Sequence, residues 1–584
     1  LKYFFKYQIG FMYFRYFMWN FAGRQNDIQG HGGILKGNWL SGIPFIDDAR
    51  LGPQNKIPKS MSDNKGMNKY YLLPLILGLV GLFFQYKKSK QEFWIVMLLF
   101  FFTGIAIIIY LNQTPYQPRE RDYGYTGSFY AFCIWIGFGV LALYNLLKNK
   151  APQVISAVLA ILLCFSVPGI MAKENWNDHD RSGRYTARDF AHNYLNSCAP
   201  NAVLFTNGDN DTFPLWYAQE VEGIRTDVRV VNLSLFNTDW YINQMRKKAY
   251  DSHPIKLTMT QDKYSQGKRD VVYLMDDPRV KDYVPLKEII DFISSDDPRT
   301  KLPQADDLSY APTRKFRLSV DSSKVVNNGT VKADIANQII KNIDWNLNKS
   351  YVTKGEMMLL DLLSTNMWER PIYFAITVGS ESYLKLEPFF QLEGLAYRLV
   401  PINTTNRDGQ IGRIDSDIMY DNMMNKFKWG GINDPKVYLD ENNLRMTMNL
   451  RNNFARLADK LLEEGKKDSA IKVLDKCIEV MPNNCVPYNY FNLGIAEAYY
   501  KANVTEKAND VINILNESTQ DDLRYFFSLE DEFAGSTEYE IKKSMMVMQE
   551  LSRLTREFKQ DTLNKKIDED FKNFYVQFSS KVKE

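Results

Sequence analysis

The side chains best suited to chemistry lie in a short polar segment between two long apolar runs. Arg119, Glu120, Arg121 and Asp122 follow one another there. Charges beside a bilayer are costly unless they are solvated, paired or used. A guanidinium can hold a phosphate by two parallel hydrogen bonds. We therefore predict that Arg119 or Arg121 binds a phosphate and that Glu120 or Asp122 orients it. A salt-bridged loop that locks two helices together is the alternative.

A second polar group is the stretch NGDNDTFPLW, which contains Asp209 and Asp211. It follows a predicted strand and precedes a predicted helix, which is where α/β folds bind ligands. The D-x-D spacing can supply oxygen ligands to a hard divalent cation, so a divalent cation is the cofactor that we consider. The alternative is an Asx-turn with a helix N-cap, because Asp and Asn favour both.

Weaker candidates are single residues or adjacent pairs. His31 stands in a flexible GHGG stretch and could contact a ligand, and the ring of Trp216 could stack on a sugar or belong to the core. Asp47 and Asp48 could share acid and base work, since one carboxylate raises the pKa of another. Neighbours in sequence usually point apart, so a solvated turn is the alternative for this pair.

Several common functions are not indicated. The sequence has no P-loop, no G-x-S-x-G, no H-E-x-x-H and no dinucleotide fingerprint. Its five cysteines include no C-x-x-C pair, so zinc and redox sites are not indicated. Lys and Arg number 72 against 69 Asp and Glu, a net charge of +3 that gives no basic footprint for nucleic acid.

The elements that must position these residues begin with the membrane. A spanning helix needs about 20 apolar residues. Four stretches separated by short polar loops approach or exceed that length. We therefore predict four transmembrane helices, at Tyr70–Tyr86, Phe93–Leu111, Tyr123–Leu147 and Ala151–Ala172.

Lysines indicate the orientation of these helices. Lys87, Lys88 and Lys90 follow the first span, and Lys148 and Lys150 follow the third. Short basic loops stay in the cytoplasm. The loop 112–122 and everything after residue 172 then lie on the other side. We expect a bacterial inner-membrane protein with a large periplasmic C-terminal region.

The first 22 residues are rich in aromatic side chains and carry Lys2, Lys6 and Arg15. Tyr and Trp favour the headgroup level of a membrane. We predict an interfacial helix over Leu1–Ala22, or the end of a helix packed on a bundle, with a fifth span as the alternative. Since the chain begins with Leu1, we expect it to be a fragment.

Residues 173–435 are predicted to form an α/β domain. Short β-type runs at 202–206 and 228–235 flank a helical stretch, which is the spacing of a parallel βαβ unit. The run 371–378 is predicted to join the same sheet. Residues 254–350 are rich in Asp, Lys and Ser and are expected to form an insertion with loops and short elements.

Residues 436–584 are predicted to be all-helical. Ala458 and Ala470 recur 38 positions later as Ala496 and Ala508 in two amphipathic helix pairs. This resembles a tetratricopeptide-type repeat, although the usual period is about 34. The fold class is therefore multi-domain: a loop region over 1–69, four spans over 70–172, the α/β domain over 173–435 and the helical repeats over 436–584.

Three stretches carry a family resemblance: NQTPYQPRERDYGYTGSFYAF from Asn112, NGDNDTFPLW from Asn207 and FMWNFAGRQNDIQG from Phe17. Together they resemble bacterial inner-membrane proteins described as protein O-mannosyltransferase-like, within the GT-C glycosyltransferase superfamily. The resemblance covers roughly residues 1–400. It implies a lipid-phosphate-linked sugar donor, membrane lipids as surroundings, and transfer to exported protein or glycan acceptors.

The resemblance also implies a catalytic carboxylate in the first periplasmic loop of such enzymes. No position of this sequence matches it, so we expect the catalytic residues in an upstream region. The alternative function is a non-catalytic assembly or export scaffold. There the α/β domain and the helical repeats would bind protein partners, because stacked repeats form concave binding surfaces.

Overall fold

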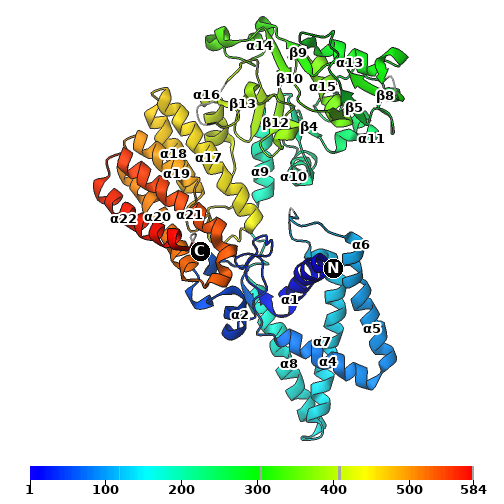
Figure 1. The fold of residues 1–584 in the computed structure, drawn as a ribbon, viewed down its shortest axis with the longest axis vertical. Coiled ribbons are helices and arrows are strands. Elements are labelled where there is room, and N and C mark those ends of the chain that lie inside the picture. The colour runs from blue at the N-terminus through cyan, green and yellow to red at the C-terminus, as the bar shows by residue number, and fades with distance from the viewer. Residues whose placement is uncertain (118, 303–304, 405–408, 582–584) are drawn as a thin grey trace. The chain divides into compact units, whose positions relative to one another are not determined.

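The computed structural model describes residues 1–584 apart from 118, 303–304, 405–408 and 582–584. The chain is mixed α/β and divides into two compact units. Unit 1 comprises residues 1–184, 434–452 and 481–584, and unit 2 comprises 185–433 and 453–480. The chain therefore passes twice from unit 1 to unit 2 and back (Figure 1).

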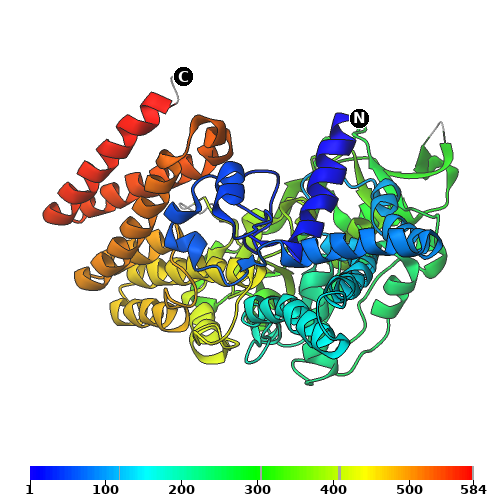
Figure 2. The same cartoon turned by 90° about the horizontal axis from the view of Figure 1, so that it is seen from below.

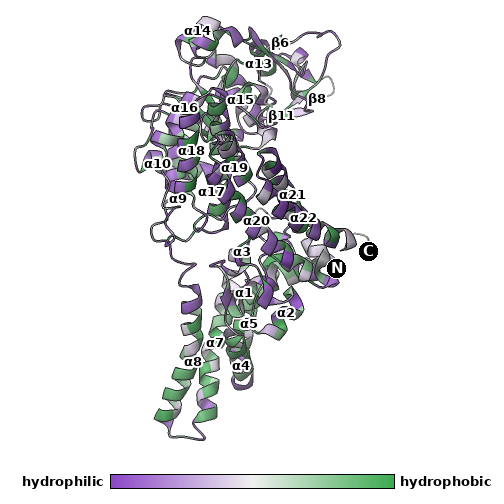
Figure 3. Cartoon of the chain, turned by 90° about the vertical axis from the view of Figure 1, so that its left-hand side faces the viewer, coloured by the Kyte–Doolittle hydropathy of each residue, from purple (hydrophilic) through white to green (hydrophobic). Residues whose placement is uncertain are grey.

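Unit 1 contains long apolar helices that stand out in Figure 3. In the part of the chain that the structure describes, three helices are long and apolar enough to cross a membrane: Lys90–Leu111, Asp122–Leu147 and Gln153–Asn175. The first bends at Gly104, where α5 (Lys90–Phe102) gives way to α6 (Ile105–Leu111). The others are α7 (Thr126–Leu147), preceded by η3 (Asp122–Tyr125), and α8 (Gln153–Asn175).

The predicted first span is not confirmed. It forms α4 (Leu73–Lys88), a helix of 16 residues. Tyr71 and Leu72 both adopt positive φ and Pro74 follows at the helix start, so the chain turns sharply before α4 begins. The apolar run is long enough in sequence, but its first residues belong to that turn.

Helix α4 instead packs closely along α7 through glycines. A methyl group at Gly81 would lie 1.7 Å from the carbonyl oxygen of Trp135, and one at Gly139 would lie 2.3 Å from that of Leu77. Small residues of this kind let membrane helices approach at backbone distance. The buried indole of Trp135 also donates to the Gln85 side chain across the contact, at 2.7 Å.

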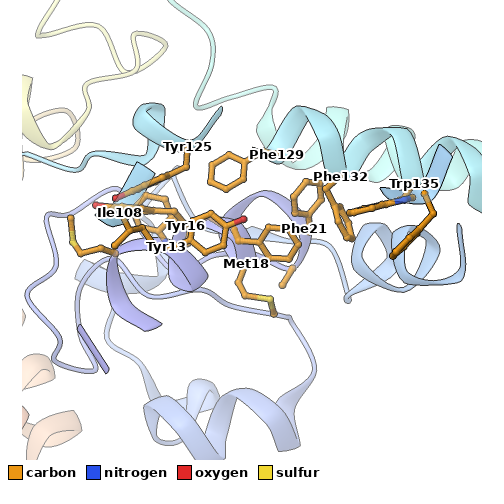
Figure 4. Packing of buried hydrophobic residues seen from close by; sticks show 14 residues of the cluster. Tyr13, Tyr16, Met18, Phe21, Ile108, Tyr125, Phe129, Phe132 and Trp135 are labelled. Atoms are coloured by element: carbon orange, nitrogen blue, oxygen red, sulfur yellow. The ribbon is translucent and has the colours of Figure 1, made fainter. Parts of the chain in front are cut away.

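The aromatic N-terminus is a helix packed on these spans. It runs as η1 (Phe4–Phe14) and α1 (Arg15–Phe21), and its second half is buried. Figure 4 shows Tyr13 and Phe21 beside Phe129 and Phe132 of α7, and Tyr16 beside Tyr125. Offset and edge-on ring pairs such as these add to the free energy gained by burial alone.

The rest of unit 1 is a loop region and a helical tail. Residues 22–72 contain the paired strands β1 (Gly23–Arg24) and β2 (Asn68–Lys69), η2 (Gln54–Lys56), and the helices α2 (Pro44–Leu51) and α3 (Lys59–Ser62). Figures 1 and 2 show the last helices of unit 1, over residues 492–581, side by side. Leu35 of the loop region is buried in one apolar cluster with Leu523, Phe526 and Met548 of the tail.

The tail helices are α17 (Glu441–Glu463), α18 (Lys467–Val480), α19 (Asn492–Lys501), α20 (Thr505–Ser528), α21 (Asp531–Glu557) and α22 (Asp561–Lys581). The second half of α17 and all of α18 belong to unit 2. The four alanines of the sequence comparison, Ala458, Ala470, Ala496 and Ala508, are all fully buried. That position suits close helix packing, while membership of the tetratricopeptide class stays a prediction.

Unit 2 is built on a six-stranded sheet in the order β15-β13-β14-β12-β3-β4. The predicted βαβ unit is confirmed: β3 (Val203–Thr206) lies parallel to β4 (Arg229–Asn232), with α10 (Asp209–Glu220) between them in sequence. The predicted third strand is confirmed as β12 (Ile372–Ala375), parallel to β3 on its other side. Antiparallel β14 (Ala396–Leu399) and β13 (Phe390–Leu392), then β15 (Arg413–Ile414), complete the sheet.

The predicted insertion carries two smaller sheets. Their orders are β11-β5-β8-β7 and β10-β9-β6. The strands are β5 (Val271–Leu274), β6 (Val284–Pro285), β7 (Lys301–Leu302), β8 (Ala305–Ala311), β9 (Lys315–Ser319), β10 (Asn342–Asn346) and β11 (Tyr351–Thr353). The remaining α-helices of unit 2 are α9 (Thr186–Asn196), α11 (Asp239–Met245), α12 (Gln261–Tyr264), α13 (Leu286–Ser294), α14 (Ser322–Asn327), α15 (Lys354–Asn366) and α16 (Ser416–Tyr420), and its helical turns are η4 (Leu235–Asn237), η5 (Pro298–Thr300), η6 (Ala333–Gln338), η7 (Ser380–Ser382), η8 (Glu387–Phe389) and η9 (Asp421–Lys426).

The α4–α7 contact can be tested by adding single methyl groups. Gly81→Ala places a carbon against the Trp135 backbone and should destabilise the protein by about 1–3 kcal/mol, the usual cost of overpacking. Gly137→Ala on α7 is the control, because nothing lies within 4 Å of the added carbon. The measurement is the thermal midpoint of the chain in detergent. Equal midpoints for both variants would contradict the close contact.

Candidate functional site

The predicted polar segment is built around one carboxylate, Glu120. Both guanidinium ends of Arg15 donate to it, at 3.1 Å and 2.8 Å. The hydroxyl of Tyr16 donates to Oε2, and the backbone amide of Gly30 donates to Oε1 at 2.9 Å. Four donors from two distant segments therefore converge on one side chain. This outcome matches the alternative that we gave for Glu120, a salt bridge that holds the loop.

Arg15, like its partner Glu120, is buried and forms several hydrogen bonds. Its side chain is 4% exposed, and that of Glu120 is 12% exposed. The guanidinium also donates to the carbonyls of Phe11 at 3.0 Å and Gly37 at 2.6 Å. It lies over the rings of Phe11 and Tyr16 at 3.9 Å and 4.3 Å, within cation–π range. A buried charge of this kind persists because its hydrogen bonds are complete.

The electrostatics keep Glu120 ionised. Burial alone would raise its pKa, but the hydrogen bonds and charge of Arg15, with the amide of Gly30 and the Tyr16 hydroxyl, hold the pKa of Glu120 below its usual value. Burial also raises the pKa of Tyr16, so this hydroxyl keeps its proton and serves as a donor. The centre is thus a fixed ion pair rather than a proton carrier.

The two flanking arginines are arranged differently. The guanidinium of Arg121 donates to the hydroxyl of Tyr123 at 2.5 Å, and that of Arg119 lies 5.8 Å from the centre of the same ring. Arg119 is exposed and Arg121 is half-buried. In the part of the chain that the structure describes, neither has a carboxylate partner. Asp122 is half-buried beside them. Two unpaired guanidinium groups on one tyrosine form a site suited to an anion.

The N-terminal helix and the glycine-rich stretch fix the loop that carries these arginines. Tyr3 and Gln8 bond the start of the loop, at the Gln113 carbonyl and the Asn112 side chain, at 2.7 Å and 3.0 Å. His31 follows the Gly30 amide that binds Glu120, and its ring lies 5.3 Å from the exposed ring of Tyr116. The structure therefore brings His31 to the predicted arginine segment.

Asp47 and Asp48 lie away from the arginine segment, and each accepts hydrogen bonds from backbone amides of nearby residues. Asp47 is 2% exposed and accepts from the amides of Ser41 and Gly42, at 2.9 Å and 2.7 Å. Asp48 accepts from the amide of Gln54 at 2.9 Å. Both residues stand in α2 (Pro44–Leu51), and the burial of Asp47 differs from the solvated turn that we gave as the alternative. The carboxylates bond different partners and do not meet at one point.

In unit 2, Asp211 lies at the carboxyl edge of the sheet. Its carboxylate accepts from the hydroxyl of Thr377, which follows β12, and Thr377 is 3.3 Å from the Tyr194 hydroxyl. Burial raises the pKa of Asp211, an effect partly offset by the Thr377 hydrogen bond. The side chain of Asn232 braces the turn by donating to the Gly208 carbonyl at 2.7 Å.

Asp209 and Asp211 both stand in the first turn of α10. Two residues apart on a helix, their side chains point about 200° apart. Among the residues that the structure describes, no group of three or more His, Cys, Asp or Glu side chains is placed to hold a metal ion. A divalent cation here would have few protein ligands, and the metal site stays a prediction.

Trp216 lies on the same helix with its ring half-exposed. It stacks on Phe213, with 5.5 Å between ring centres and 28° between ring planes. Phe213 is itself 54% exposed. The pair therefore forms an aromatic surface and not a core contact, and sugar stacking on Trp216 stays a prediction.

No sequence pattern indicates the partners of Glu120 directly. Arg15 and Tyr16 are more than 100 residues from it in the chain. One signal was present: Arg15 is the charged residue in the aromatic stretch Arg15–Phe21, and such a charge needs a counter-charge when it is buried. Gly30 and Gly37 contribute through their backbones, which no side-chain pattern could indicate.

The ion pair predicts a defined dependence of stability on pH. Because the pKa of Glu120 is depressed in the folded protein, its stabilisation is complete above its unfolded value of about 4.3 and is lost as the pH falls below it. Glu120→Gln should remove that acid-dependent part and destabilise the protein at neutral pH by about 3 kcal/mol. Thermal unfolding in detergent from pH 7 to pH 3 measures both effects.

A double-mutant cycle supplies the control. Arg15→Met combined with Glu120→Leu removes both charges at once and should be less damaging than either single change, because no buried charge is left alone. Strictly additive losses would contradict the direct pairing.

Comparison with known proteins gives one finding, and it concerns unit 2. A family model described as TMEM260-associated domain 2 matches residues 187–418. No curated protein and no solved structure matches the chain. The matched range covers the sheet, the turn with Asp209 and Asp211, and the insertion.

This finding corrects the family resemblance drawn from the sequence. The expected bacterial O-mannosyltransferase-like family of the GT-C superfamily is wrong, because the matching family carries a different description. The NGDNDTFPLW stretch lies inside the matched domain, and its residues build the turn from β3 into α10. What the comparison assigns is therefore a domain: residues 187–418 are similar to TMEM260-associated domain 2.

Proposed function

We propose that unit 1 binds the phosphate of a membrane lipid that carries a sugar, and that the protein takes part in transferring this sugar to an acceptor. The observation that carries the proposal is the pair of unpaired guanidinium groups of Arg119 and Arg121 beside Tyr123, at the start of the helix Asp122–Leu147. Glu120 between them is neutralised by Arg15, so the net charge of this surface is positive.

The position of this site favours a lipid ligand over a free phosphate. The segment joins two helices that are apolar and long enough to cross a membrane. Tyr116, Tyr123 and Tyr130 are exposed on or beside it, and tyrosine favours the headgroup level. A phosphate on a membrane lipid lies at that level, whereas a soluble phosphate gains nothing from the surrounding apolar surface.

The proposed chemistry is a displacement at the anomeric carbon of the sugar. An acceptor hydroxyl forms a bond to that carbon while the bond to the phosphate oxygen breaks. The lipid phosphate leaves with the electron pair, and Arg119 and Arg121 stabilise its charge. The proton of the acceptor passes to a general base, a role that we assign to none of the described residues.

The lysine pattern supports an orientation for this site. The basic residues lie in two turns, with Lys87, Lys88 and Lys90 between α4 and α5 and Lys148 and Lys150 between α7 and α8. Basic turns remain in the cytoplasm. The arginine segment and the residues after the last apolar helix then lie on the non-cytoplasmic side, which is the periplasm in a Gram-negative cell. Acceptors would be exported proteins or glycans.

A second function has one observation in its favour. A groove of about 1280 Å³ runs along α21 between the start of α19 and α22. Tyr539 and Met546 on its surface are 75% and 69% exposed, although the opposite face of α21 is buried in the tail. Exposed apolar side chains in a groove are typical of a protein-binding surface, which suits a non-catalytic scaffold.

Binding of the lipid phosphate can be measured directly. The chain is placed in nanodiscs and titrated with a fluorescent polyprenyl phosphate, with the corresponding polyprenyl alcohol as a matched ligand. Arg119→Ala with Arg121→Ala should weaken binding of the phosphate by about tenfold or more, since two charge-assisted contacts are lost. Arg279→Ala, an exposed arginine paired with Asp277 in unit 2, is the control variant.

Transfer is tested separately. Nanodiscs with the chain are incubated with a polyprenyl-phosphate sugar and an acceptor extract, and mass spectrometry follows free polyprenyl phosphate and glycosylated product. The proposal expects both products from the unaltered chain and neither from the double arginine variant. Equal binding of phosphate and alcohol, or intact transfer by the double variant, would contradict it.

A further inference from the structure

Unit 2 carries an exposed surface that the proposed function does not use. Phe213, Tyr217 and Val221 repeat every four residues along α10 and its last turn, and are 54%, 46% and 68% exposed. Residues at this spacing lie on one face of a helix. The opposite face is packed normally, since Leu215 and Ala218 are fully buried. Helix α10 is therefore apolar on two sides, and Phe213, Tyr217 and Val221 on its outer side stay largely exposed among the described residues of unit 2.

Two lysines and a tyrosine extend this face. The hydroxyl of Tyr250 donates to Glu220, which places the turn after α11 beside the end of α10. Tyr250 is 56% exposed, and Lys247 and Lys248 in the same turn are exposed. Neither lysine forms an ion pair with a carboxylate of the described residues. We call Phe213, Trp216, Tyr217, Val221, Lys247, Lys248 and Tyr250 the aromatic–basic patch.

We propose that the aromatic–basic patch binds the headgroup layer of an anionic membrane and so holds unit 2 against the bilayer. Aromatic side chains with a polar tip, such as Tyr and Trp, are most stable where hydrocarbon meets headgroups. Lysines beside them are attracted to anionic lipids. The patch presents both kinds of side chain on one exposed face.

The chain itself keeps unit 2 within reach of a membrane. The apolar helix α8 ends at Asn175, and unit 2 begins at Tyr185. The residues between them can span no more than about 30 Å even when extended. Tyr185 is 53% exposed and stands at the start of α9, which packs against α10 (Figure 1). The patch therefore belongs to the part of unit 2 nearest in sequence to the membrane helix.

The inference is independent of the lipid-phosphate site, because none of its residues lies in unit 1. A protein surface is the competing occupant, and it differs in chemistry. A buried protein contact would leave Lys247 and Lys248 needing carboxylate partners, whereas a headgroup layer supplies phosphates and water together.

The test measures the depth of one patch residue in the bilayer. The full chain, with Cys133→Ser and Cys485→Ser, is placed in nanodiscs and labelled with a fluorophore at Tyr217→Cys. Lipids brominated near the headgroup act as quenchers. A label at Tyr351→Cys, another exposed tyrosine of unit 2, is the matched control. We expect severalfold stronger quenching at position 217 than at 351, and stronger quenching in anionic than in neutral discs.

Charge reversal then tests whether attraction to anionic lipid causes the stronger quenching at position 217. Lys247→Glu with Lys248→Glu should abolish the difference between anionic and neutral discs. Lys268→Glu with Lys281→Glu makes the same charge change at exposed sites of unit 2 and should leave it unchanged. Equal quenching at 217 and 351 would overturn the proposal. Protection of position 217 from both lipid and aqueous quenchers would overturn it in favour of a protein contact.

Discussion

Unit 1 depends on one buried ion pair, that of Arg15 and Glu120. The pair joins the N-terminal helix to the loop that precedes the helix Asp122–Leu147, and the backbones of Gly30 and Gly37 complete its hydrogen bonds. Loss of either partner would leave the other charge buried and uncompensated, which is strongly destabilising. The bidentate contact also fixes the relative position of the helix and the loop, because two parallel hydrogen bonds orient the planar guanidinium on the carboxylate.

The same ion pair explains why the neighbouring Arg119 and Arg121 are not paired with Glu120. Arg119, Glu120, Arg121 and Asp122 follow one another in sequence, and Glu120 is the one that pairs with the buried Arg15. Arg119 and Arg121 consequently point away from the carboxylate between them, toward Tyr123. A sequence of alternating charges would otherwise neutralise itself within the loop. Because Glu120 pairs with the distant Arg15, the guanidinium groups of Arg119 and Arg121 remain available to a ligand.

Much of the fold could be predicted from the sequence, and the failures have physical reasons. Apolar length identified the three helices that are long and apolar enough to cross a membrane, but Tyr71 and Leu72 adopt a left-handed conformation that shortens the first predicted span. Strand pairing of β3, β4 and β12 followed from β-type runs placed around a helix. The arginine segment could be predicted because its residues are adjacent. Its supports could not, because pairing over about 100 residues leaves no local pattern.

The family resemblance failed for a related reason. Short polar motifs were interpreted as signs of a shared activity. In the structure, one of these motifs, NGDNDTFPLW, forms a turn that Asn232 braces by donating to the Gly208 carbonyl. Residues that favour turns recur wherever a strand leads into a helix. Two carboxylates in such a motif, Asp209 and Asp211, are therefore weaker evidence for a ligand than their residue types indicate.

The burial of Leu35 among residues 523–574 has a consequence for biosynthesis. These partners are separated by most of the chain, so the apolar cluster cannot close until the last helices have left the ribosome. Contacts this distant in sequence form slowly, because a long loop must first be closed. The loop region that carries Leu35 must remain partly folded until the rest of the polypeptide has been made. Premature termination of translation would thus leave the apolar side chains of the loop region exposed to chaperones and proteases.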